Sequence, residues 1–103
     1  MLFKSLKLYL EQEVDLEWLC AQLVDFGYSR QSAVAVEGDF SRRGGIVDIF
    51  PFSFELPIRI ELENEKVVAI NAFDPDSGQP LWAHNIAIIL PFKKSSVSRG
   101  QSF

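Results

Sequence analysis

The stretch Ser41–Phe52, SRRGGIVDIFPF, places two arginines and two glycines directly before a run of large apolar residues that a proline ends. Ile46–Phe50 has the composition of a buried strand, with Asp48 as its one charged residue. Glycine tolerates the backbone conformations that a sharp bend or a bulge requires. We therefore predict that Gly44–Gly45 bends the chain beside this strand and that Arg43 is displayed at the strand's edge.

The clearest alternation of apolar and charged residues lies just downstream, over Ile58–Glu63. A period of two residues predicts a strand with one buried face. Asn64–Glu65 predicts a tight turn, because Asn tolerates positive φ, and Val67–Ala72 then predicts the returning strand of a hairpin. Three further strands are expected, over Leu6–Leu10, Ser32–Glu37 and Ile86–Leu90.

One helix is predicted over Leu16–Phe26. Asp15 is a favourable N-cap residue, and Gly27 is a typical residue just after a helix end. Trp18 lies on the polar side of this helix and needs cover from the rest of the domain or from a partner. Five side chains fall on the apolar arc at helical spacing: Leu16, Leu19, Cys20, Leu23 and Val24.

Length and pattern together predict an α+β fold, a mostly antiparallel twisted sheet packed with one main helix. A chain of 103 residues argues for one domain, over residues 1–92, followed by a polar C-terminal tail over 93–103. A net charge of −4 speaks against general nucleic-acid binding. One cysteine cannot form an internal disulfide, and the sequence shows no membrane span or signal peptide, so we expect a cytoplasmic protein.

Residue types that carry catalysis or bind metals are sparse. His84 is the only histidine and Cys20 the only cysteine, which is too few for a zinc site or a conventional catalytic pair. Glu61 and Glu63 share one strand face and could do acid–base chemistry as a small hydrolase, although a solvated face is the simpler interpretation. We therefore predict no catalytic residue, no metal and no cofactor.

Two arginines remain as candidates for a partner-binding role. Arg59 projects to the face opposite Ile58 and Ile60, and Arg43 precedes a strand that must lie near it, so both can share the outer face of the sheet. Guanidinium groups on a rigid sheet suit carboxylates of a partner protein. The alternative is intramolecular pairing of Arg59, with Glu61 or with an acidic side chain on a neighbouring strand, and the sequence does not separate the two.

Several motifs occur in the order and spacing of one known module. Their sequence resembles the UvrA-binding domain shared by the bacterial transcription-repair coupling factor and the UvrB excision-repair helicase. The resemblance covers about Leu6 to Pro91, and the short ELP connection is more similar to the coupling factor. The motifs are FGYSR (Phe26–Arg30), EGDFSRRGGIVDIFP (Glu37–Pro51), ELPIRIEL (Glu55–Leu62), FDPDSGQPL (Phe73–Leu81) and IAIILP (Ile86–Pro91).

This resemblance implies a non-catalytic docking module that recruits UvrA in nucleotide excision repair coupled to transcription. It implies partner contacts at Arg43, Arg59 and Glu63, the last standing where the family usually has an aromatic residue. A monomer is expected, with the first and last strands close together because the module is an insertion in its relatives. The ATP hydrolysis and DNA translocation of those relatives are not assigned to this chain. The alternative, motivated by Glu63, is a diverged relative that keeps the fold and binds a different protein.

Overall fold

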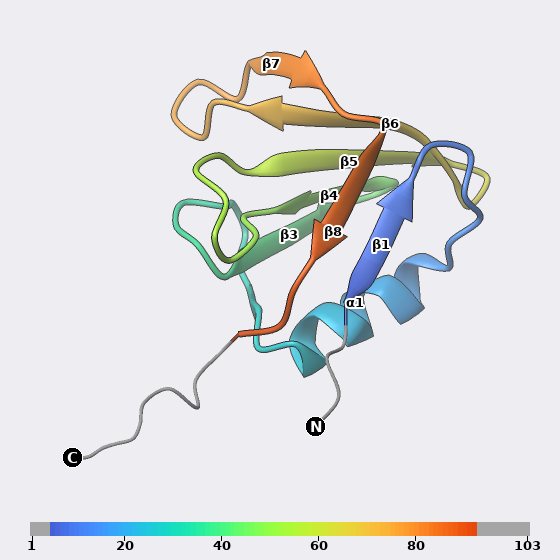
Figure 1. The fold of residues 1–103 in the computed structure, drawn as a ribbon, viewed down its shortest axis with the longest axis horizontal. Coiled ribbons are helices and arrows are strands. Elements are labelled where there is room, and N and C mark those ends of the chain that lie inside the picture. The colour runs from blue at the N-terminus through green and yellow to red at the C-terminus, as the bar shows by residue number, and fades with distance from the viewer. Residues whose placement is uncertain (1–4, 93–103) are drawn as a thin grey trace.

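A computed structural model describes residues 5–92 of the chain, and the tail predicted over 93–103 lies outside the described residues. One helix and eight strands make up this part of the chain (Figure 1). In chain order the elements are β1 (Leu6–Tyr9), α1 (Leu16–Asp25), β2 (Ser29–Arg30), β3 (Asp39–Arg43), β4 (Ile46–Ile49), β5 (Ile58–Glu63), β6 (Lys66–Phe73), β7 (Pro80–Ala83) and β8 (Ile86–Ile89).

The strands form two sheets. Six of them make one sheet in the order β2-β3-β4-β5-β6-β7, and β1 pairs with β8 in a separate two-stranded ribbon. All neighbouring strands run antiparallel except β2 and β3, which run parallel. The predicted α+β fold with a mostly antiparallel sheet is confirmed.

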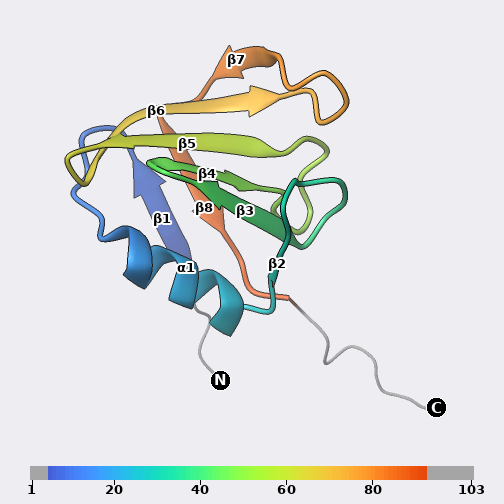
Figure 2. The same cartoon turned by 180° about the vertical axis from the view of Figure 1, so that it is seen from behind.

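The core lies between the large sheet and a second layer formed by α1 together with the β1–β8 ribbon (Figures 1 and 2). The prediction of one helix against the sheet was therefore incomplete, because the ribbon covers part of the same face. Fully buried side chains come from both layers: Leu8, Leu19, Leu23 and Ile89 on one side, and Phe40, Val47, Ile49, Ile58, Ile60 and Ile70 on the other.

The Gly-Gly pair forms the two-residue turn between β3 and β4, so the predicted bend is confirmed. Arg43 pairs with Ile46 across this turn, and Gly44 has a φ of 59°. Gly45 is needed for a different reason, since a Cβ there would lie 2.6 Å from the carbonyl oxygen of Leu62. The Leu62 amide donates to the Gly45 carbonyl oxygen over 2.8 Å, so β4 and β5 approach closely at this point.

The predicted hairpin of β5 and β6 is also present. Asn64 and Glu65 connect the strands with φ values of 52° and 65°. The register shifts between Glu61 and Leu62, which indicates a bulge opposite them in β6. Alternation of burial nevertheless continues along β5, whose apolar residues stay on the core face.

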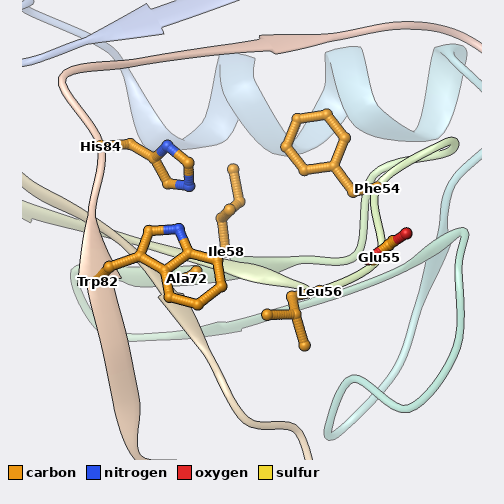
Figure 3. A pocket seen from close by; sticks show the side chains of 7 residues that line it. All are labelled: Phe54, Glu55, Leu56, Ile58, Ala72, Trp82 and His84. Atoms are coloured by element: carbon orange, nitrogen blue, oxygen red, sulfur yellow. The ribbon is translucent and has the colours of Figure 1, made fainter.

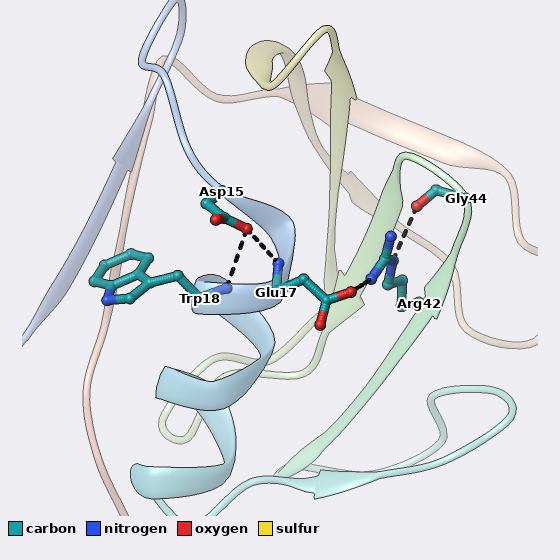
Figure 4. A network of polar contacts seen from close by, with 5 residues as sticks. All are labelled: Asp15, Glu17, Trp18, Arg42 and Gly44. Carbon is teal, nitrogen blue, oxygen red and sulfur yellow. Dashed lines mark hydrogen bonds and ion pairs between the residues drawn. The ribbon is translucent and has the colours of Figure 1, made fainter.

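Helix α1 begins as predicted at Asp15, whose Oδ1 accepts from the amides of Glu17 and Trp18 over 2.8 and 3.4 Å (Figure 4). Glu17 reaches Arg42 of β3 over 3.3 Å, which ties the start of the helix to the sheet. Val24 was expected on the apolar arc, but it is 59% exposed because it lies beyond the edge of the covered face. Trp18 is 48% exposed, so the described residues leave half of it without the expected cover.

One predicted strand is absent, and one strand of the structure was not predicted. Ser32–Glu37 does not form a strand, because the Asp39 carboxylate accepts from the amides of Ala35 and Val36 and folds the segment into bends. Pro80–Ala83 does form one, β7, which pairs with the end of β6. All four of its residues are exposed. Because neither face of β7 is buried, its sequence does not alternate between apolar and polar residues as that of a half-buried strand does.

The first and last strands pair as expected, with Leu6 opposite Ile89 and Tyr9 opposite Ile86. The two ends of the described chain therefore lie on the same side of the molecule (Figure 1). No helix within residues 5–92 is long and apolar enough to cross a membrane.

Candidate functional site

The outer face of the large sheet carries a row of polar residues across its middle strands. In the register, Ser41 of β3 stands opposite Asp48 of β4, and Asp48 stands opposite Arg59 of β5. Ile58 and Ile60 point to the core, so Arg59 projects to the outer face, as the alternation predicted. Arg43 belongs to the same face because it lies two residues beyond Ser41 on β3.

Arg59 is held by three hydrogen bonds and by contact with an aromatic ring. Its Nε and Nη2 donate to the two carboxylate oxygens of Asp48 over 2.8 and 3.1 Å, and its Nη1 donates to the Gly78 carbonyl over 3.2 Å. The guanidinium carbon also lies 4.4 Å from the centre of the Phe73 ring. The hydrogen bonds that Arg59 donates to Asp48 raise the pKa of Arg59, against a smaller opposing effect of burial. The alternative expectation, that Arg59 pairs within the domain, is therefore confirmed, and its partner is Asp48 of the neighbouring strand β4 and not Glu61.

Arg43 is held much more loosely. Its only ion pair within the described chain is a 3.6 Å contact between Nη2 and Oδ2 of Asp48. The Arg43 side chain is 56% exposed, whereas Arg59 is 20% exposed and Asp48 only 8%. The cluster therefore consists of two cations around one buried carboxylate, and the guanidinium of Arg43 faces the solvent.

A hollow of about 260 Å³ lies over this cluster. One wall comes from the segment between β2 and β3, and the other from the turn between β6 and β7. An incoming side chain would meet both arginines between these walls. The lining residues are Ser32, Ala33, Val34, Ser41, Arg43, Asp48, Arg59, Phe73, Pro75, Asp76, Ser77 and Gly78.

Glu63 lies at the end of β5 opposite Lys66, fully on the surface. No ion pair within residues 5–92 joins it to Arg43 or Arg59, so the structure leaves it at the margin of the cluster. Neither Glu61 nor Glu63 lines the hollow over the arginines, and the hydrolase alternative gains no support from their placement.

The remaining candidates for chemistry lie elsewhere. Cys20 is buried in the core, and burial raises the pKa of its thiol, which disfavours the reactive thiolate. His84 follows β7 on the opposite side of the sheet. Neither residue contacts the arginine cluster.

Asp48, Phe73 and Gly78 were not predicted as site residues. A signal for Asp48 was present in the sequence, since it is a single charge inside an apolar strand. Phe73 and Gly78 reach Arg59 only through the pairing of β5 with β6 and the turn that follows, which no local pattern encodes.

Residues 6–94 match the model of the UvrB interaction domain. The chain belongs to this family. It is 42% identical over 64 residues to the transcription-repair-coupling factor of Bacillus subtilis, a match that covers 62% of this chain and 5% of that protein. It is 46% identical over 66 residues to the protein of the same name from Staphylococcus aureus strain MSSA476, which covers 64% and 6%.

The chain thus spans about one twentieth of the length of these relatives. The resemblance inferred from the quoted motifs is confirmed, both for the UvrB interaction domain and for its similarity to coupling factors.

Proposed function

We propose that this domain is a docking module that recruits UvrA through the outer face of its sheet, as part of transcription-coupled nucleotide excision repair. The observation that carries the proposal is the arginine cluster: Arg43 of β3 and Arg59 of β5 share one face of the six-stranded sheet and line one hollow. The choice of UvrA as the partner rests on the resemblance of the quoted motifs to the UvrA-binding domain, and membership in the UvrB interaction domain family supports it.

Arg43 makes the dominant contact with the partner. Its side chain is more than half exposed, and its long contact with Asp48 is easily exchanged for a shorter one with a partner carboxylate. Arginine is enriched among the residues that dominate interface energetics.

Arg59 contributes in two ways. Three of its five N–H groups are used within the domain, which leaves two for a partner. Its bidentate grip on Asp48 also fixes the carboxylate that stands between the two guanidinium groups. We therefore expect Arg59 to contribute both directly and by positioning.

Glu63 is proposed to lie at the rim of the same interface. It places an exposed charge where relatives usually have an aromatic residue, and an aromatic residue there would add apolar contact area. Replacing Glu63 with Phe should accordingly tighten binding.

Titration of UvrA with the wild-type domain, with Arg43→Ala and with Arg59→Ala tests the proposal by calorimetry or fluorescence anisotropy. Each substitution should weaken binding by about tenfold or more. Arg42→Ala is the matched control, since Arg42 is the neighbouring arginine but reaches across to Glu17 on the helix side. It should bind UvrA like the wild type.

Equal affinity of all four proteins would remove the arginine face as the docking surface. Absence of UvrA binding by the wild type, with Arg43-dependent capture of a different bacterial protein, would favour the diverged relative instead.

A further inference from the structure

The ribbon of β1 and β8 has two outer edges, and the edge at β1 is closed. In an antiparallel pair, residues bonded across the pair alternate with residues whose N–H and C=O groups point outward. The Gln12 side chain accepts from the Tyr9 amide over 3.0 Å and donates to the Lys7 carbonyl over 3.2 Å. The Gln12 amide donates to the Tyr9 carbonyl over 3.2 Å. Gln12 therefore occupies the edge of β1 in place of a further strand.

The edge at β8 is open. The Leu10 amide donates to the Asn85 carbonyl over 3.2 Å, which fixes the alternation along the ribbon. The N–H and C=O groups of Ile86 and Ile88 consequently point away from β1. Within residues 5–92, β8 pairs with no strand except β1, and no hydrogen bond engages these outward groups. Four main-chain groups are thus available to an added strand.

One end of this open edge meets an apolar hollow on the core face of the large sheet, where α1 and the ribbon leave it uncovered. His84 lines the hollow and lies two residues before Ile86, the first residue of β8 (Figure 3). Trp82 lies beside His84 and is 55% exposed. The hollow has a volume of about 170 Å³. Its floor is formed by Ile58 and Ala72, which are 1% and 2% exposed.

The other end of the open edge meets the opposite wall of the hollow. The Leu90 carbonyl accepts from the Tyr28 hydroxyl over 3.2 Å, and that hydroxyl accepts from the Phe52 amide over 3.0 Å. The chain continues from Phe52 to Phe54, which forms the second wall together with Leu56 (Figure 3). The open edge of β8 therefore spans the mouth of the hollow from one wall to the other.

A strand added at this edge would place its side chains alternately on two surfaces. Residues opposite Ile86 and Ile88 would lie on the outer face of the ribbon, where these two isoleucines are 45% and 47% exposed. The residue between them would stand beside Ala87 and point into the hollow. Ala87 is buried and small, so it leaves room for a large neighbour. The edge thus fits an apolar triplet whose central residue is large.

The surroundings favour an uncharged segment of another protein. Glu55 is the one residue with a formal charge among those that line the hollow. A second copy of this chain is a poor occupant for a steric reason. Its β8 would bring its own large sheet beneath the ribbon, where this chain already has β5 and β6 (Figure 1). A single extended segment carries no such second layer.

We propose that β8 accepts an added antiparallel strand from a partner protein, an uncharged segment with a large apolar residue between two β-branched residues. Main-chain hydrogen bonds to Ile86 and Ile88 provide affinity, and the hollow selects the central side chain. Burial of that side chain against Trp82 favours binding by about 25 cal/mol for each Å² removed from water. This site uses neither Arg43 nor Arg59 and is independent of the proposed recruitment of UvrA.

The test uses Trp82 as its own reporter. The chain has two tryptophans, and Trp18 is a half-exposed residue of α1, so Trp18→Phe leaves Trp82 as the sole emitter and keeps the core intact. The probe is the synthetic peptide acetyl-Gln-Thr-Val-Phe-Val-Thr-Gln-amide. Its addition should shift Trp82 emission to shorter wavelength in a saturable manner.

Three matched peptides test the mode of binding. Ala in place of Phe should weaken binding by about tenfold, because the side chain that fills the hollow is missing. Methylation of both Val amides should also weaken binding by about tenfold, because the Val residues stand opposite Ile86 and Ile88 and bond to them. Methylation of the Phe amide is the control, since that N–H group points away from β8, and it should leave affinity nearly unchanged.

The same hydrogen bond is tested from the side of the protein. Ile86→Pro removes an outward N–H group at the first residue of an edge strand, where proline is tolerated. Ile86→Ala removes the isoleucine side chain but keeps the N–H group. Both variants should retain the native circular dichroism spectrum, and the proline variant should bind the probe several-fold more weakly than the alanine variant.

Three results would overturn the proposal: no change in Trp82 emission up to about 1 mM peptide, equal affinity of the Phe and Ala peptides, or unchanged affinity after methylation of the Val amides. A shift in Trp82 emission that depends on protein concentration and needs no peptide would identify a second copy as the occupant. A shift caused by deletion of residues 93–103 without peptide would identify the chain's own C-terminal segment. Either result would overturn the proposal equally.

Discussion

Replacing Asp48 with Asn removes the charge that both arginines face while keeping the size of the side chain. Asp48 is 8% exposed and accepts two hydrogen bonds from Arg59, whose own side chain is 20% exposed. Loss of one partner of a fully buried ion pair costs about 3–5 kcal/mol. Partial exposure of Arg59 lowers this, and we expect a loss of about 2–3 kcal/mol in the free energy of unfolding.

A double-mutant cycle separates the two arginines. Urea-induced unfolding of Asp48→Asn, Arg59→Gln and the double variant should give a coupling energy of about 1.5–3 kcal/mol. The same cycle with Arg43→Gln should give about 0.5 kcal/mol or less, because that contact is 3.6 Å long and half exposed. Arg43→Gln should therefore leave stability nearly unchanged while it weakens partner binding.

A coupling energy between Asp48 and Arg43 as large as that between Asp48 and Arg59 would refute the inference that Arg59 is tightly paired whereas Arg43 faces the solvent. Couplings near zero for both would show that the buried carboxylate does not organise the face.

Three further predictions concern the scaffold. In urea unfolding, Gly45→Ala should destabilise the domain more than Gly44→Ala, although only Gly44 of the two has a positive φ. The reason is that a Cβ at Gly45 would lie 2.6 Å from the Leu62 carbonyl oxygen, whereas a Cβ at Gly44 would meet open space. A larger loss of stability for Gly44→Ala would contradict this. Burial raises the pKa of Tyr28 to about 12. The contribution of Tyr28 to the free energy of unfolding is therefore constant below about pH 10. It falls by about 3 kcal/mol between about pH 10 and 12, because the phenol ionises in the unfolded chain before it does so in the folded one. Unfolding measured across this range should show the fall in the wild type relative to Tyr28→Phe, and parallel curves would contradict it. Asp15→Ala should cost about 1 kcal/mol of stability by removing the N-cap of α1, and an unchanged thermal midpoint would contradict that.

Much of the architecture was predictable because its signals are local. The alternation over Ile58–Glu63, the turn at Asn64–Glu65 and the cap at Asp15 each depend on residues within a few positions of one another. The alternation that places Arg59 opposite Ile58 and Ile60, together with the position of Arg43 before the Gly-Gly turn, likewise located the outer face. The motifs that surround them located the family.

The sequence pattern of a segment gave a wrong or incomplete prediction where contacts with residues outside that segment decide its structure. Ser32–Glu37 has the composition of a strand, but Asp39 binds its amides and folds it into bends. β7 has no alternation of burial, and only the exposed edge of β6 makes it a strand.

The sequence by itself thus determined the single helix, the hairpin of β5 and β6 with its buried face, and the presence of two arginines outside the core. Only the tertiary structure decided that Asp48 pairs closely with Arg59 and loosely with Arg43, that Phe73 lies under one guanidinium, and that Trp82 borders an open hollow. The reason is that periodicity and capping act along the chain, whereas the register between strands is set by the packing of the whole core.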